Sequence, residues 1–196
     1  MPEVTANMMI TLDGYAAGEG QSLERPFGDI DTTRLEAWRD QAEENAEELA
    51  AITASGAFVM GRNMFGPDRG EWDLDWHGWW GPNPPYHAPT FVLAHRPRPS
   101  IEMEGGTVFH FVTEGIEAAL ERAREAAGEK NVSIAGGPST LNQYLAAGLV
   151  DELRLHVAPF VAGGGERLFA GAAGIELKPA SSRTTPHVTH LVYRRR

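Results

Sequence analysis

The chain has 196 residues, of which 42% are hydrophobic and 22% are charged, so its composition is globular and excludes collagenous or largely disordered sequence. The formal net charge of −10 at pH 7 disfavours nucleic acid as a partner, because such binding depends on lysine and arginine displacing counterions. The absence of cysteine excludes disulfides, thiolate metal sites and a cysteine nucleophile.

The first predicted strand and helix follow from the pattern near the amino terminus. The apolar run 4–12 predicts a buried strand that ends at a turn led by Asp13. Residues 33–51 then predict one long helix, in which Thr33 and Glu36 have the spacing of a capping box. The polar side of this helix is expected to face solvent.

Two predicted strands are each followed directly by basic residues. A strand at 57–60 is followed by the glycine–arginine pair 61–62, and a strand at 90–94 is followed by the histidine–arginine pair 95–96. An arginine at such a corner can donate two hydrogen bonds to a phosphate. A salt bridge on the surface is the alternative interpretation.

The carboxyl-terminal half continues the alternation of strands and helices. Residues 106–129 predict a strand and then a helix with Thr113 as its N-cap and Ile116, Leu120 and Ala123 on one face.

A further strand at 131–137 leads into a short helix closed by Gly148. Residues 151–159 predict a strand, and the runs 175–184 and 187–195 suit an antiparallel hairpin. The pattern predicts one three-layer α/β domain over residues 1–196, with a mostly parallel sheet covered on both faces and an antiparallel end. In such sheets, ligands bind outside the carboxyl ends of the strands.

The segment AGGPST, at the end of one of these strands, is the first candidate ligand site. Gly136 and Gly137 permit close approach to the backbone, and Pro138 suits the first turn of a helix. The free N–H groups of such a turn favour a phosphate. A plain helix start capped by Ser139 or Thr140 is the alternative, and the segment matches neither GxxxxGK[ST] nor GxGxxG.

A segment rich in glycine and proline carries four of the five tryptophans, at positions 72, 76, 79 and 80. Trp76, Trp79 and Trp80 could close a pocket and stack on a flat heterocycle. They could equally be buried at a contact between two subunits.

Other polar residues have several interpretations. His77, His87 and His95 match no metal-ligand spacing, so no metal is expected. Asp13, just after the first strand, is either catalytic or the first residue of a turn. The three glycines 163–165 indicate a tight turn or a close backbone approach.

The order of the motifs ITLDGYAA, VMGRNMF, FVLAH and IAGGPSTLNQYLAAGLVDELRLHVAPFVAGGGERLF resembles the dihydrofolate reductase superfamily. The resemblance is specifically to the reductase branch found at the carboxyl end of bifunctional riboflavin-biosynthesis enzymes and in stand-alone relatives. It covers nearly the whole chain and is most specific from Ser133 to Phe169.

The resemblance implies a dihydrofolate reductase-like fold and an NADPH site. Asp13 matches the aspartate that faces the substrate in the riboflavin branch, and Ala16 and Ala17 would lie near the nicotinamide. The resemblance implies these further cofactor contacts: Gly61 and Arg62 near the adenosine phosphates, Ala94, His95 and Arg96 at the adenine, and Ala135, Gly136, Gly137, Ser139 and Thr140 around the pyrophosphate.

Two positions depart from the family pattern. Riboflavin-pathway reductases often carry a glutamate where this chain has Ala135, and many relatives carry a hydroxyl residue at the place of Met64. No match to the folate-binding carboxylate of dihydrofolate reductases is present.

The sequence therefore predicts an NADPH-dependent reductase of a small pteridine- or pyrimidine-like heterocycle. A non-catalytic nucleotide or small-ligand binding protein on the same fold is the alternative. Without a signal-peptide pattern or a run of ~18 apolar residues, a cytoplasmic protein with no membrane partner is expected. A homodimer is also expected.

Overall fold

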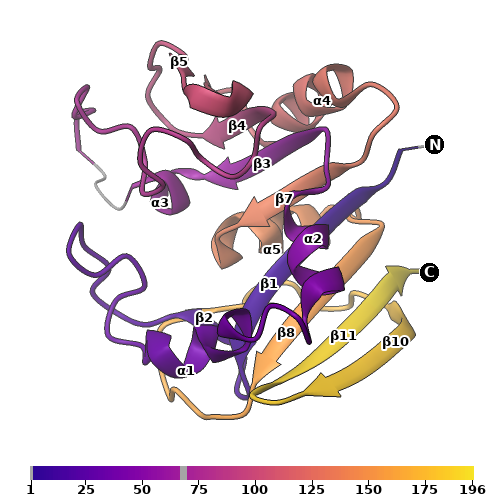
Figure 1. The fold of residues 1–196 in the computed structure, drawn as a ribbon. Helices are drawn as coiled ribbons and strands as arrows, with labels where there is room; N and C mark the ends of the chain where they lie inside the picture. Colours follow the sequence, from indigo (N-terminus) through magenta and orange to yellow (C-terminus); the bar gives the residue numbers. More distant parts are fainter. Residues whose placement is uncertain (1, 67–69) are drawn as a thin grey trace.

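A computed structural model describes residues 2–66 and 70–196, and within these residues a nine-stranded sheet forms the centre of the protein (Figure 1). The strand order is β10-β11-β8-β1-β7-β3-β4-β6-β5, and β2 and β9 form a separate two-stranded sheet. The strands are β1 Val4–Thr11, β2 Tyr15–Ala17, β3 Ala57–Gly61, β4 Pro89–Leu93, β5 Ile101–Glu102, β6 Val108–Val112, β7 Val132–Gly136, β8 Glu152–Ala158, β9 Glu166–Arg167, β10 Leu177–Thr185 and β11 Val188–Arg195.

The large sheet is parallel except near its two edges. Strands β8, β1, β7, β3, β4 and β6 run parallel, whereas β11, β10 and β5 pair in antiparallel fashion. This arrangement confirms the predicted mostly parallel sheet with an antiparallel carboxyl-terminal hairpin. The parallel strands are apolar because helices or loops bury both of their faces.

Helices cover both faces of the sheet and make a three-layer structure. Helices α4 and α5 pack on one face through the largest core cluster, and α1 packs on β1 and β8 from the opposite face. Residues 70–88 cover β3, β4 and β6 on that opposite face through a second cluster. The helices are α1 Thr32–Glu36, η1 Ala37–Asp40, α2 Ala46–Thr53, α3 Arg62–Phe65, η2 Glu104–Gly106, α4 Ile116–Ala127 and α5 Pro138–Ala146.

The long helix predicted at 33–51 is wrong, because the chain forms α1, the 3₁₀ turn η1 and α2 instead. Trp38 is fully buried and stacks on His156 at 4.7 Å between ring centroids. The buried Asn45 side chain donates hydrogen bonds to the carbonyls of Trp38 and Gln41, at 2.8 and 2.9 Å. Tertiary burial of the ring therefore interrupts the helix, and Asn45 satisfies the freed carbonyl groups.

The two predicted N-caps are also wrong. Asp31 caps α1, since its carboxylate accepts a hydrogen bond from the Arg34 backbone N–H at 3.1 Å, so the proposed Thr33–Glu36 capping box does not form. Gly115 is the N-cap of α4, whereas the Thr113 hydroxyl donates to the Glu114 carboxylate at 3.2 Å. The predicted apolar face of α4 is confirmed by the burial of Leu120 and Ala123.

Candidate functional site

The predicted corner segments lie side by side along one edge of the large sheet, namely the edge that the carboxyl ends of its parallel strands form. Because β1, β7, β3 and β4 are parallel and adjacent in that order, their carboxyl ends meet at the edge where α3 and α5 begin (Figure 1). Three strand spacings amount to about 15 Å. A ligand lying along this edge would pass residues 13–17, 136–140, 61–62 and 94–96 in turn.

The central corner is the glycine pair before α5. The Gly136–Gly137 peptide bond is cis, and Gly137 is the N-cap of the helix. The first backbone hydrogen bond of the helix runs from Leu141 N–H to the Gly137 carbonyl at 3.0 Å, so the preceding N–H groups of Ser139 and Thr140 have no acceptor within the helix. Among the described residues, nothing lies within 4 Å of a Cβ built on Gly137. Open space thus adjoins a helix start whose first N–H groups have no acceptor within the helix, and such a start favours the phosphates of a nucleotide.

Thr140 and Ser139 do not cap this helix, because the N-cap position is a glycine. Thr140 is buried, and its hydroxyl lies against Gly61. A Cβ added at Gly61 would come closer than 3.0 Å to the Thr140 hydroxyl oxygen, a separation that is essentially never observed for a Cβ atom. Ser139 is exposed. The absence of a side chain at Gly61 therefore lets β3 touch the first turn of α5.

Arg62, the first residue of α3, lies in the next corner. Its guanidinium lies 3.8 Å from the ring centroid of Trp72 and donates a hydrogen bond to the Gly70 carbonyl at 3.1 Å. Met64 reaches back to the central corner, where its sulfur would lie 3.5 Å from a Cβ on Gly136. The arginine thus lies at the edge of the candidate site, beside the tryptophan-rich segment.

The same segment contacts the corner after β4. The Ala94 N–H donates to the Val112 carbonyl at 3.0 Å, His95 is exposed, and Arg96 forms an ion pair with Glu71. The Trp72 indole N–H donates to the Arg96 carbonyl at 3.1 Å. This part of the tryptophan-rich segment therefore lies on the β3–β4 side of the central corner.

The other three tryptophan rings of the segment make contacts with residues of the same chain. Trp76 donates its indole N–H to the Phe65 carbonyl at 2.8 Å and meets Trp79 edge to face at 4.8 Å. Trp80 stacks on Phe109 with centroids 5.8 Å apart. These contacts fix the segment as a cover over β3, β4 and β6, on the opposite side of the glycine pair from Asp13.

Arg98, which lies between two prolines in the sequence, holds this cover in place. Its sequence context did not indicate this role. Its guanidinium donates hydrogen bonds to the carbonyls of Leu74 and Trp76 at 3.1 and 2.7 Å and is almost fully buried. Burial lowers its pKa from the usual value.

Asp13 lies at the other end of the edge, where it accepts three hydrogen bonds. The donors are the Thr11 hydroxyl at 2.5 Å and the backbone N–H groups of Ala162 and Gly163 at 3.0 and 2.7 Å. Chiefly because of the Thr11 hydrogen bond, the pKa of Asp13 falls from 3.8 to about 2. Asp13 is therefore a carboxylate at neutral pH that ties the first turn to the loop after β8.

This geometry predicts the pH dependence of an Asp13→Asn variant. The lowered pKa means that the carboxylate stabilises the fold above pH 3.8 and loses this effect as the pH falls towards 2. The variant should melt below wild type at pH 7, and the gap should close between pH 4 and 2. Circular dichroism melts at several pH values measure it, and a gap that is constant with pH would contradict the assignment.

Ala16 and Ala17 are buried on β2, which the sequence did not predict as a strand. This strand pairs with β9, and Gly165 makes that pairing possible because a Cβ there would overlap the Ala17 carbonyl. The glycine run 163–165 is thus a close backbone approach, one of its two interpretations.

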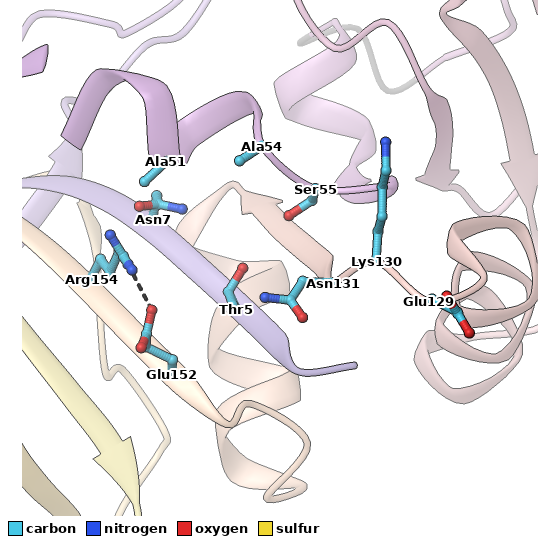
Figure 2. A pocket seen from close by; sticks show the side chains of 10 residues that line it. All are labelled: Thr5, Asn7, Ala51, Ala54, Ser55, Glu129, Lys130, Asn131, Glu152 and Arg154. Atoms are coloured by element: carbon cyan, nitrogen blue, oxygen red, sulfur yellow. Dashed lines mark hydrogen bonds and ion pairs between the residues drawn. The ribbon is translucent and has the colours of Figure 1, made fainter. Parts of the chain in front are cut away.

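A polar hollow of about 350 Å³ lies at the opposite end of the strands (Figure 2). Its walls include Thr5 and Asn7 of β1, Arg154 of β8, and Lys130 and Asn131 just before β7. Because these residues lie before their strands or in the amino-terminal halves of them, the hollow is distinct from the edge that carries the glycine pair.

Within residues 2–66 and 70–196, no group of three or more His, Cys, Asp or Glu residues is placed to hold a metal ion. In the same ranges, no helix has the length and apolar character needed to cross a membrane.

Comparisons with known proteins place the chain among reductase-like folds. The family model of the RibD C-terminal domain matches residues 2–191. A Shewanella protein named as a riboflavin biosynthesis protein is similar at 21% identity and a TM-score of 0.64, with 99% of each chain covered. A search of curated proteins returned no match.

Two further solved structures carry more specific names. A pyrimidine reductase-like protein of Corynebacterium diphtheriae has 17% identity and a TM-score of 0.59, over 99% of this chain and 92% of that one. The deaminase/5-amino-6-(5-phosphoribosylamino)uracil reductase of Thermotoga maritima has 15% identity and a TM-score of 0.60. That match covers 99% of this chain but only 56% of the bifunctional one.

Proposed function

The chain belongs to the RibD C-terminal domain family, in the dihydrofolate reductase-like superfamily, and on this premise we propose that it is an NADPH-dependent reductase of a small nitrogen heterocycle. The heterocycle would be pteridine- or pyrimidine-like. Bound NADPH would supply a hydride, and the chain would hold the two reactants in line and exclude water.

One observation carries the proposal: the open glycine corner before α5 stands between the corners of β1 and β3. Among the described residues, nothing lies within 4 Å of the position that a Cβ on Gly137 would take, and this open space adjoins the first turn of α5. An extended dinucleotide along this edge would hold its pyrophosphate at the helix start. Its two ends would reach the β4 corner on one side and β2 on the other.

The residue roles follow from this orientation. Ala135 to Thr140 would hold the pyrophosphate, with Thr140 acting through its N–H because its hydroxyl faces Gly61. Arg62 and the segment Ala94 to Arg96 would hold the adenosine end, under the cover that Trp72 begins. Ala16 and Ala17 would let the nicotinamide approach β2 closely, since both side chains are small.

We propose that Asp13 lines the substrate side of the site as a carboxylate and also holds the loop after β8. Its pKa of about 2 leaves it without a proton to donate at neutral pH. An ordered water is the proposed proton source. Trp76, Trp79 and Trp80, as part of the fixed cover over β3, β4 and β6, would shield the adenosine end of the site.

The proposed substrate class follows from the names of two structurally similar proteins and from Ala135. The Thermotoga enzyme is named as a uracil reductase, and the Corynebacterium protein as pyrimidine reductase-like. Ala135 lacks the carboxylate that riboflavin-pathway reductases often carry before the glycine pair. We therefore propose a flat heterocycle that differs from the riboflavin intermediate where that carboxylate would make contact.

Titration of the purified protein with NADPH and with NADH tests the proposal. Saturable fluorescence enhancement of the reduced nicotinamide, stronger for NADPH, is expected. A protein that binds neither cofactor would remove the proposal altogether.

Arg62→Ala supplies the matched comparison between the two cofactors, which differ in the 2′-phosphate. Losing a charge-assisted contact to that phosphate should weaken NADPH binding about tenfold, or about 1.4 kcal/mol. NADH binding should change less than twofold. Equal losses for both cofactors would show that Arg62 does not contact the 2′-phosphate.

A non-catalytic nucleotide-binding protein is the second candidate, favoured by the lack of a protonated acid at Asp13. Oxidation of NADPH in the presence of pteridines and pyrimidines separates the two, since a binding protein would hold the cofactor without turnover. A homodimer and a cytoplasmic location complete the proposal.

A further inference from the structure

Asn142, in the second turn of α5, makes a two-point contact with a distant backbone segment. Its side chain is buried and donates a hydrogen bond from Nδ2 to the Arg167 carbonyl at 3.1 Å. Its Oδ1 accepts a hydrogen bond from the Phe169 N–H at 2.7 Å. The side-chain amide serves both partners at once, because its NH₂ group donates one hydrogen bond and its oxygen accepts the other.

The segment held by Asn142 carries the partner strand of β2. In the small sheet, Tyr15 pairs with Arg167 and Ala17 pairs with Glu166. The buried Leu168 adds a backbone hydrogen bond from its N–H to the Gly14 carbonyl at 2.9 Å. The position of β2 therefore depends on where residues 166–168 lie.

The backbone conformation of Phe169 is a further reason why a side chain such as Asn142 is needed at this point. Its φ of +67° lies in the left-handed region, which few non-glycine residues adopt. Such a conformation persists where neighbouring contacts hold it. The hydrogen bond from the Phe169 N–H to Asn142 is such a contact.

We propose that Asn142 is a positioning residue that sets the nicotinamide strand β2 relative to the pyrophosphate corner, an inference that rests on the proposed function. The first turn of α5 holds the phosphates, and one turn later the same helix fixes β9 and through it β2. Because β2 belongs to the small sheet, this bridge links the two halves of the cofactor site. A displacement of about 1 Å at such a junction misaligns reacting groups.

Asn142→Leu tests the bridge, since leucine has a similar size but makes neither hydrogen bond. The probes are NADPH and adenosine 2′,5′-bisphosphate, which lacks the nicotinamide. We expect about a tenfold weaker NADPH affinity and a smaller nicotinamide fluorescence enhancement. The affinity for the bisphosphate, measured by displacement or calorimetry, should stay within twofold of wild type.

Asn142→Asp and Gln143→Ala complete the design. Aspartate keeps the acceptor for Phe169 but sets a buried carboxylate oxygen against the Arg167 carbonyl, so a loss of NADPH affinity of at least about tenfold is expected, with the bisphosphate affinity again within twofold of wild type. It also replaces the leucine variant if that variant fails to fold. Gln143 is the exposed neighbour on the same helix, and its substitution should leave both affinities unchanged.

The outcomes separate this inference from the proposed function. If wild type binds NADPH but the Asn142 variants lose both probes equally, Asn142 merely supports the helix and the inference is overturned. Unchanged NADPH binding and fluorescence in those variants would also overturn it. If wild type itself binds no nicotinamide cofactor, the proposed function falls first and the inference falls with it.

Discussion

Replacing Gly165 with alanine should destabilise the protein by about 2 to 6 kcal/mol. Gly165 has a φ of +119°, where a residue with a side chain costs about 1 to 3 kcal/mol. A Cβ there would come closer than 3.0 Å to the Ala17 carbonyl and to the Gly18 Cα, which are backbone atoms that cannot rotate away. Overpacking of this kind costs about 1 to 3 kcal/mol more. The sum is a large share of the free energy of unfolding of a typical domain, which is about 5 to 15 kcal/mol.

Gly164→Ala is the matched control one residue earlier. A Cβ on Gly164 would lie 3.6 Å from the Glu19 carboxylate, an ordinary contact, so its effect should stay below about 1 kcal/mol. Urea unfolding of both variants measures the difference. Equal midpoints would contradict the role of Gly165 as the point where β9 approaches β2. In the folded fraction of the Gly165 variant, NADPH binding should also weaken, because Ala17 belongs to the proposed nicotinamide strand.

The large sheet could be predicted because each central strand is a short apolar run that ends at a turn or a basic corner. Strands β2 and β9 could not, since runs of three and two residues show no periodicity. Their pairing joins segments about 150 residues apart and depends on a glycine contact that is visible only in three dimensions. The order of the corners along the edge likewise follows from the topology.

Side chains that act across the fold were the harder part of the site. Asn142 resembles any polar helix residue in the sequence, and Arg98 resembles any surface arginine beside proline. Both are buried, and each hydrogen-bonds the backbone of a segment more than 20 residues away. A buried polar group must find such partners, but the sequence does not indicate where they lie.

Replacing Gly61 with alanine should weaken NADPH binding about 10- to 100-fold. Gly61 has a φ of −80°, which alanine adopts readily, so the change acts through contact alone. The new Cβ would overlap the Thr140 hydroxyl and lie 3.4 Å from the Thr140 Cβ. Thr140 is buried, so the first turn of α5 must shift, at a cost of about 1 to 3 kcal/mol. NADPH fluorescence titration measures the loss.

Thr140→Ala turns this prediction into a double-mutant cycle. Removing the hydroxyl removes the overlap with the new Cβ at position 61 and leaves the Thr140 Cβ at the edge of ordinary contact. The double variant should therefore bind NADPH nearly as well as Thr140→Ala alone, with a coupling that offsets most of the loss in Gly61→Ala. Additive losses would mean that Gly61 serves the cofactor by another route, such as direct approach of its backbone to a phosphate. Rescue would instead assign Gly61 to the alignment of α5, on which both the pyrophosphate corner and the Asn142 bridge depend.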